Sequence, residues 1–110
     1  MATINVSEED CWIVARWAFR AVLGPTIEEL ADTNDKKVIL QALALDGLHF
    51  PLIDPVQARR IALALVKADE QVRTSLLEAD PATLELRDVE FIDYLSAIES
   101  SLHKHYDESS

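Results

Sequence analysis

The chain has 110 residues, 49% of them hydrophobic, with only two glycines and four prolines. This composition excludes a disordered chain, and the length allows one hydrophobic core but not two. Ten basic residues against twenty acidic ones give a formal net charge of −10, so direct binding to the phosphates of a nucleic acid is not expected. We expect a single domain over 1–110 with frayed ends at 1–6 and 106–110.

The first main helix is expected at 8–23, in the segment that begins with Ser7. The serine can cap free backbone N–H groups, and the acidic residues that follow it suit the positive end of a helix dipole. Gly24 and Pro25 are a typical stop signal. At about 100° per residue, nearly the whole circumference of this helix is apolar. Its narrow polar strip is formed by Glu9, Arg16 and Arg20. Such a helix must be covered by the rest of the chain or by a second protein.

Two further helices are expected before the middle of the chain. Thr26-Ile-Glu-Glu has the pattern of a capping box, which predicts a short helix at 27–31. The next main helix is expected at 35–46, with Gly47 as its stop. An unusually apolar connection follows it.

The second half of the chain contains the longest predicted helix. Asp54-Pro55 is a strong start signal, and the apolar stripe after it predicts a main helix at 55–79. Asp80-Pro81 repeats this signal and predicts a short helix at 81–86. The last main helix is expected at 88–105, where apolar residues recur with helical spacing.

These four main helices predict an all-α bundle, because no segment outside Thr3-Ile-Asn-Val alternates as a strand does. Cys11 is expected in an apolar core, where a thiol is inert, and a lone cysteine indicates a reducing compartment. No apolar run approaches the roughly 18–20 residues of a membrane span, and no signal-peptide pattern is present, so we expect a cytoplasmic protein that does not bind membranes. The other predicted core residues are Ala18, Val38, Leu45, Ile61, Leu65, Val72, Leu95 and Ile98.

No catalytic, cofactor or metal site is expected. The sequence has no phosphate-binding glycine loop, no serine elbow and no zinc-protease pair. Glu99, His103 and Asp107 follow one another at i, i+4 spacing and could surround a divalent ion, but three ligands at a chain end need a fourth from elsewhere. A solvated last turn is the simpler interpretation, and we expect neither an enzyme nor a bound cofactor.

Aromatic residues are concentrated in the first predicted helix. Tryptophan is enriched among the anchors of protein interfaces, although packing within the core explains the same rings. The arginines beside them either pair with acids of a neighbouring helix, such as Glu90 or Asp93, or clamp an acidic partner. The candidate interface residues, including one from the apolar connection, are Trp12, Arg16, Trp17, Phe19, Arg20 and Phe50.

Acidic residues are dense between Asp69 and Glu99, and they define a candidate acidic surface of Asp80, Glu85, Asp88, Glu90 and Asp93. Such a surface keeps a protein in solution or attracts a basic partner. The sequence therefore favours a small interaction module that binds a partner protein or a second copy of itself, the latter as a two-fold homodimer. The alternative is an acidic inhibitor or immunity-type protein that blocks the basic site of a nuclease or another nucleic-acid-binding protein.

Overall fold

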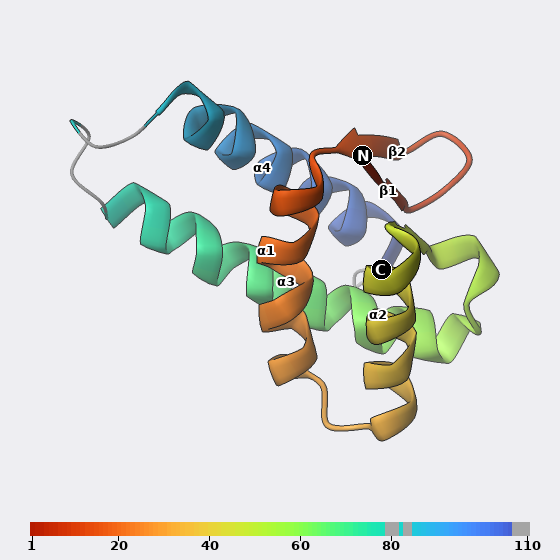
Figure 1. Ribbon diagram of the computed structural model, residues 1–110. Coiled ribbons are helices and arrows are strands. Elements are labelled where there is room, and N and C mark those ends of the chain that lie inside the picture. Colours follow the sequence, from red (N-terminus) through yellow and green to blue (C-terminus); the bar gives the residue numbers. More distant parts are fainter. Residues whose placement is uncertain (79–81, 83–84, 107–110) are drawn as a thin grey trace.

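The computed structural model describes residues 1–78, 82 and 85–106, the side chain of Arg87 excepted. This part of the chain is mostly helical but also contains a small sheet, so the all-α prediction is confirmed only in part. Figure 1 shows α1 and α2 side by side, crossing in front of α3, with α4 running beside α3. The elements are β1 (Ala2–Asn5), β2 (Cys11–Val14), α1 (Arg16–Glu29), α2 (Thr33–Leu45), β3 (Gly47–His49), the 3-10 turn η1 (Phe50–Leu52), α3 (Pro55–Glu78) and α4 (Leu86–Tyr106).

The N-terminal segment forms a β-hairpin, so the predicted frayed end at 1–6 is wrong, and the predicted helix at 8–23 is wrong over 8–15. β1 pairs antiparallel with β2, and Ile4 lies opposite Trp12. Ser7 stabilises the turn rather than a helix, because its Oγ accepts a hydrogen bond from the N–H of Asp10 at 3.1 Å. β-Branched and aromatic residues on both sides of that turn favour the pleated conformation. The buried residues of the first strand region are Ala2, Ile4 and Val6, each at most 2% exposed.

β1 is the central strand of a three-stranded sheet with the order β2-β1-β3. Its pairing with β3 is parallel, with Thr3 opposite Gly47. Side chains alternate between the two faces of the sheet: Ile4, Val14 and Leu48 are buried, whereas Ile13 is exposed. One face of the sheet therefore covers the helices and the other faces solvent.

Helix α1 begins at Arg16 and continues through Gly24 and Pro25 to Glu29, so the predicted stop is wrong. A proline inside a helix removes one backbone bond and clashes with the Cβ of the residue before it, but Gly24 has no Cβ. Thr26 also supports this turn, because its hydroxyl donates to the carbonyl of Val22 at 2.8 Å. The short helix expected at 27–31 is accordingly the last turn of α1.

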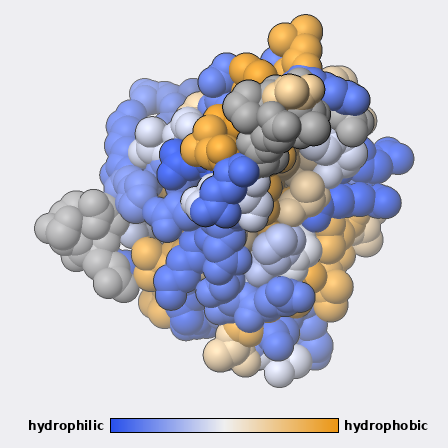
Figure 2. All heavy atoms as spheres, turned by 90° about the vertical axis from the view of Figure 1, so that its left-hand side faces the viewer, coloured by the Kyte–Doolittle hydropathy of each residue, from blue (hydrophilic) through white to orange (hydrophobic). Residues whose placement is uncertain are grey.

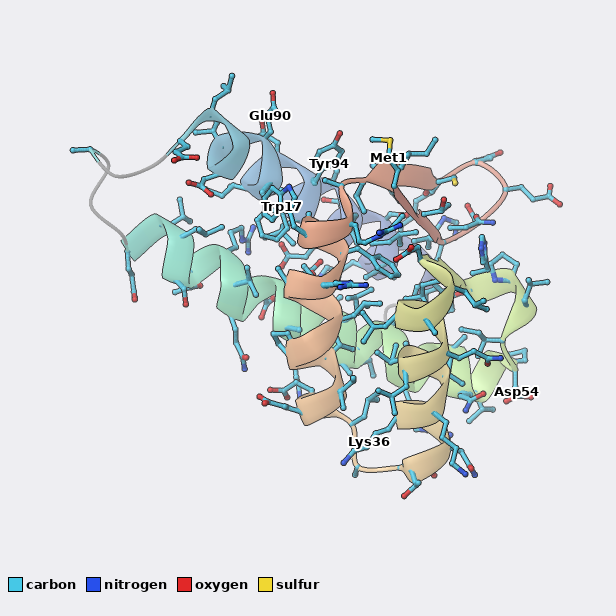
Figure 3. All side chains as sticks on the ribbon, in the orientation of Figure 1. Met1, Trp17, Lys36, Asp54, Glu90 and Tyr94 are labelled. Atoms are coloured by element: carbon cyan, nitrogen blue, oxygen red, sulfur yellow. The ribbon has the colours of Figure 1, made fainter. Side chains whose placement is uncertain are left out.

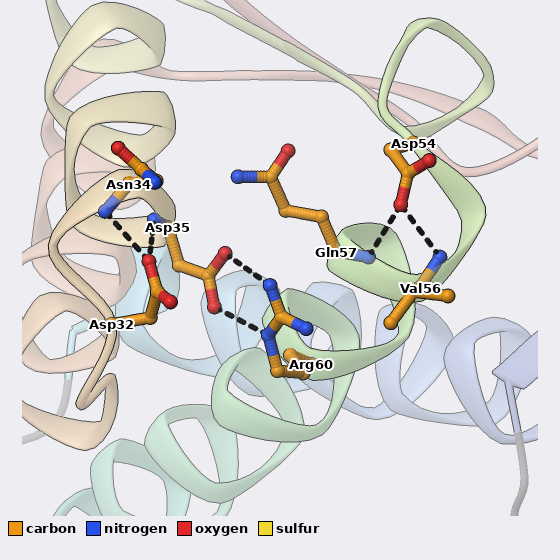
Figure 4. Close-up of polar contacts among 7 residues, drawn as sticks. All are labelled: Asp32, Asn34, Asp35, Asp54, Val56, Gln57 and Arg60. Atoms are coloured by element: carbon orange, nitrogen blue, oxygen red, sulfur yellow. Dashed lines mark hydrogen bonds and ion pairs between the residues drawn. The ribbon is translucent and has the colours of Figure 1, made fainter.

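The other three helices follow the predicted ranges closely. α2 begins at Thr33 because the carboxylate of Asp32 accepts the N–H groups of Asn34 and Asp35, and Asp54 caps α3 in the same way (Figure 4). The predicted ranges 35–46, 55–79 and 88–105 thus correspond to α2, α3 and α4. Most of the predicted short helix at 81–86 lies outside the described residues, and so do residues 107–110 of the predicted frayed end at 106–110. Tyr106 itself belongs to α4.

The core lies between α1, α3, α4 and the inner face of the sheet. Leu45 was predicted there but is 72% exposed, because the inner face of α2 is centred on Ile39 and Ala42 and Leu45 lies about 60° around the helix from Ala42. Of the other predicted core residues, two are only half-buried, Val38 and Val72. The fully buried ones are Ala18, Ile61, Leu65, Leu95 and Ile98. Over the described residues, none of the helices combines the length and the hydropathy that crossing a membrane requires.

Candidate protein-interaction surface

Two of the aromatic candidates belong to the core and cannot form an interface in the folded protein. Phe19 of α1 and Phe50 of η1 are each 1% exposed. Phe50 packs against Tyr106 near the end of α4, with ring centroids 5.4 Å apart. For these two residues the core interpretation is the correct one, because contact with a partner would require unfolding.

The expected pairing of the α1 arginines with acids of a neighbouring helix is found for Arg16, but the acid lies at the end of α2; within the described residues neither arginine pairs with α4. The guanidinium of Arg16 forms an ion pair with Asp46 at 2.9 Å. Asp46 ends α2 in the left-handed conformation, with φ of 53°, a geometry that aspartate tolerates better than most residues. Arg20, one turn further along α1, is exposed. Arg16 therefore fastens the start of α1 to the end of α2 and is only half available to a partner.

Trp17 is the centre of an exposed apolar patch. Its side chain is 43% exposed, and its ring meets that of Phe91 on α4 edge to face, with centroids 5.0 Å apart. Figure 3 shows Met1, Trp17, Glu90 and Tyr94 gathered where the hairpin, the start of α1 and α4 meet. Together with Ile13 they line a hollow of about 220 Å³. We call the four exposed apolar side chains of this hollow the Trp17 patch: Met1, Ile13, Trp17 and Tyr94, which are 82%, 61%, 43% and 40% exposed.

Trp12 lies in a neighbouring depression between β2 and α4. The ring is half-buried, and the depression is lined on the α4 side by Glu90, Asp93, Tyr94 and Ala97. Glu90 and Tyr94 line both this depression and the hollow of the Trp17 patch, so the two form one continuous surface. The structure thus brings together Trp12 and Trp17, which lie on different elements, with two of the predicted acidic residues.

The candidate acidic residues do not all play the same part. The Asp88 carboxylate accepts the N–H of Glu85 at 2.9 Å and so stabilises the first turn of α4. The carboxylates of Glu90 and Asp93 have no hydrogen bond or ion pair within the described part of the chain. Asp80 lies outside the described residues. Figure 2 views the end where α3 stops and α4 starts, and hydrophilic residues cover most of it between separate hydrophobic groups.

Two buried carboxyl groups between α3 and α4 were missed by the sequence analysis. Asp69 is 0% exposed, and among the described residues neither of its carboxyl oxygens has a hydrogen-bond partner. Burial, together with the negative charge of Glu99, raises the pKa of Asp69 to about 8, although Arg73 opposes the shift. Glu99 contacts Arg73 at 3.3 Å, yet burial still raises its pKa. The signal was present, since each acid follows a core leucine, Leu65 or Leu95, by four residues.

A serine, an aspartate and a histidine meet near the end of α4, but not in the order that nucleophilic catalysis needs. The Asp10 carboxylate lies between the others, 2.8 Å from Ser101 Oγ and 3.0 Å from His105 Nε2. A catalytic triad requires the histidine between serine and aspartate, so that it can take the serine proton. The hydrogen bonds from Ser101 and then His105 lower the pKa of Asp10. These contacts fasten the hairpin to α4.

Cys11 is exposed on β2, so the prediction of a buried thiol is wrong. It occupies an outward position of the strand, which a helical projection could not reveal. Among the described residues no group of three His, Cys, Asp or Glu side chains could hold a metal ion. The predicted column of Glu99, His103 and Asp107 is not complete within these residues, because Asp107 lies outside them.

The chain was compared with protein-family models, with curated proteins and with solved structures, and none of these comparisons gave a match. Its function must therefore be argued from its own surface.

Proposed function

We propose that this protein is an interaction module that binds a partner protein, or a second copy of itself, through the Trp17 patch. The observation that carries the proposal is the grouping of four large apolar side chains, each at least 40% exposed, on segments distant in sequence. Contiguous exposed apolar patches mark interaction sites more often than scattered apolar residues do. Tryptophan and tyrosine are also the residues most often found as interface anchors.

The geometry of Trp17 supports its role as an anchor. Its ring packs edge to face on Phe91, which is itself 5% exposed and fixed in the core. A side chain that is already held in place loses little conformational freedom on binding, so more of its buried area contributes to affinity. Trp17 therefore presents a preorganised apolar surface to a partner.

Replacing Trp17 with alanine tests the proposal. We expect Trp17→Ala to weaken association by about 2 kcal/mol, which is about 30-fold in Kd. The free energy of unfolding, measured by chemical denaturation, should fall by less than that. Sedimentation of the purified protein over a range of concentrations measures self-association, and affinity capture from source cells with wild type and variant as baits measures binding to other proteins. Leu52→Ala is the matched control, because Leu52 is 84% exposed and does not line the patch.

The outcome that refutes this proposal is a wild-type protein that stays monomeric and retains no protein that Trp17→Ala releases. Equal losses for Trp17→Ala and Leu52→Ala would also count against it, because they would show that the position of the apolar side chain does not matter.

An acidic inhibitor or immunity-type function is a second candidate, favoured by the unpaired carboxylates of Glu90 and Asp93 beside the aromatic residues. Such a protein would place these charges in the basic site of its target. Binding dominated by apolar contacts should persist at high ionic strength, whereas binding dominated by these carboxylates should fall as the Debye length shortens. A salt titration of the captured complex separates the two functions.

A further inference from the structure

β2 is an edge strand whose outer side pairs with no other strand in the described part of the chain. Its sequence, Cys11-Trp-Ile-Val, contains no charge, proline or glycine. Natural proteins usually protect an exposed sheet edge with charged residues, prolines or bulges, because an open edge pairs with other chains. The lack of such protection in β2 therefore needs an explanation.

The register of the hairpin determines which main-chain groups face this open edge. The N–H of Val6 donates to the carbonyl of Asp10 at 2.9 Å. Because hydrogen-bonded and non-hydrogen-bonded pairs alternate along an antiparallel ladder, Ile4 and Trp12 form a hydrogen-bonded pair, and the N–H and C=O groups of Trp12 point inward, toward β1. The N–H and C=O groups of Cys11 and Ile13 consequently point outward, ready to bond an added strand.

Helix α4 runs alongside β2 and the start of α1. Three contacts show that β2 and α4 run in opposite directions. From the end of the hairpin turn onward, Asp10 contacts Ser101, Trp12 lies across a depression from Ala97, and Trp17 packs on Phe91. The depression at Trp12 and the hollow of the Trp17 patch, which share Glu90 and Tyr94, form a groove between β2 and α4. An added strand in this groove would bond to β2 on one side and contact α4 on the other.

The charges in the groove favour a basic partner over a second copy. Glu90 and Asp93 lie beside Trp12 and Tyr94, an arrangement that can bind a lysine or arginine through carboxylates and aromatic faces together. A second copy would bring its own net charge of −10 to the same place, and such charge opposes self-association.

We propose that a partner segment with a basic side chain flanked by apolar ones adds as a strand to the free edge of β2, with its basic group over Glu90 and Asp93. This inference rests on the proposed function and names the class of partner.

A phage-displayed library of random decapeptides, selected on the immobilised protein, provides the probe. Enriched sequences should share a lysine or arginine between apolar residues, and the corresponding synthetic peptides should bind the protein in solution. The double variant Glu90→Gln, Asp93→Asn should lose at least tenfold in affinity for them. Glu28→Gln with Glu78→Gln removes the same charge from exposed positions outside the groove and should leave the affinity unchanged.

Strand addition has its own readouts, which simple docking of side chains would not affect. Ile13→Pro removes an outward N–H and should lower peptide affinity at least tenfold relative to Ile13→Ala, which keeps it. Because the proline variant can also perturb folding, hydrogen exchange of the wild type provides an independent measurement. The amides of Cys11 and Ile13 should exchange at least tenfold more slowly when the peptide is bound.

Several results would overturn this inference. Enrichment of peptides without a basic residue would refute it, and so would edge amides that exchange as fast in the complex as in the free protein. In both cases the proposed function stands if Trp17→Ala still releases the peptide. Protection of the edge amides by concentration-dependent self-association alone would make a second copy the occupant instead. If no peptide is enriched, the inference fails. If peptides are enriched but Trp17→Ala does not weaken their binding, both the inference and the proposed Trp17 patch fail.

Discussion

Asp35 and Asp69 are both buried aspartates, and they differ in every other electrostatic respect. Asp35 of α2 is 1% exposed and receives two hydrogen bonds from Arg60 of α3, at 2.8 and 3.0 Å (Figure 4). These bonds lower the pKa of Asp35 despite its burial. The carboxyl group of Asp69 on α3 has no hydrogen-bond partner in the described part of the chain, and its pKa is raised to about 8. A fitting partner, rather than the degree of burial, thus decides which buried carboxyl is charged at neutral pH.

The partners themselves explain the difference. The fork of Arg60 meets both oxygens of a single carboxylate, the geometry in which guanidinium and carboxylate bind best. Arg73 instead contacts Glu99, at 3.3 Å, and influences Asp69 only through its charge. One cation therefore serves two buried acids between α3 and α4, and the acid without direct contact keeps its proton.

The largest expected effect tests the unpaired acid. In the folded state Asp69 holds its proton up to about pH 8, whereas in the unfolded chain it releases it near pH 4, so stability must fall as the pH rises between these values. From pH 5 to pH 8 this contributes a loss of about 4 kcal/mol in unfolding free energy. Asp69→Asn stays neutral and should remove most of that slope, which urea denaturation across this pH range would measure.

An Asp69→Asn protein that is less stable than wild type at pH 8 would contradict this comparison. It would mean that the carboxylate is charged and stabilised in the folded protein. The Asp35→Asn variant is the matched control, because it makes the same chemical change at the other buried aspartate.

For Asp35→Asn the expected sign is the opposite. The variant loses a charge-assisted pair and should destabilise the protein by about 2 kcal/mol at pH 7, at the low end for a buried pair because Arg60 is half exposed. The pKa of Asp35 is lowered, so its stabilisation is present above the unfolded value near 4 and is lost as the pH falls through the folded value. The stability difference between wild type and variant should therefore shrink in acid, as thermal unfolding at pH 3 and pH 7 would record.

The smallest effect concerns the shared cation. Arg73→Gln leaves Glu99 without its ion pair and should lower stability by about 1 kcal/mol at pH 7, a modest value because the pair is long and Arg73 is a third exposed. The positive charge of Arg73 favours the charged forms of Asp69 and Glu99, so its removal costs stability only where these acids are charged. The stability difference between wild type and variant should therefore vanish near pH 4, where both acids are protonated in the folded state. A loss that is equally large at pH 4 would indicate that Arg73 acts through packing rather than charge.

The helices of the second half of the chain could be predicted because their signals are local. Asp54 and Pro55 fix the start of α3, and one continuous apolar stripe carries it to Glu78. The buried acids could not be assigned in the same way, because Asp69 and Glu99 only adjoin the apolar stripes of their helices and their burial depends on how two helices meet. Sequence spacing identifies such a position without telling whether the partner helix brings a cation to it.

The hairpin was missed because its residues satisfy two local patterns at once. Ser7 followed by acidic residues marks a helix start as well as a turn, and Cys11 to Val14 is apolar in either periodicity. The deciding interaction is distant, since β1 gains a second partner in β3 only after two helices. The candidate surface was predicted only in part, because it too depends on contacts between distant segments. The sequence identified Trp12, Trp17, Glu90 and Asp93. The fold adds Met1, Ile13 and Tyr94 to them.

The position of β1 also has a consequence for how the protein opens. Thr3 pairs with Gly47, and the chain between them forms α1 and α2, so the sheet can be completed only when both helices have folded back. Closing so long a loop is entropically unfavourable, which makes this pairing a late and slow event in folding. In the folded protein, detachment of the first strand region would expose the buried side chains of Ala2, Ile4 and Val6. The amides of β1 should then exchange with solvent much more slowly than the outward amides of β2, which need no opening of the sheet to exchange.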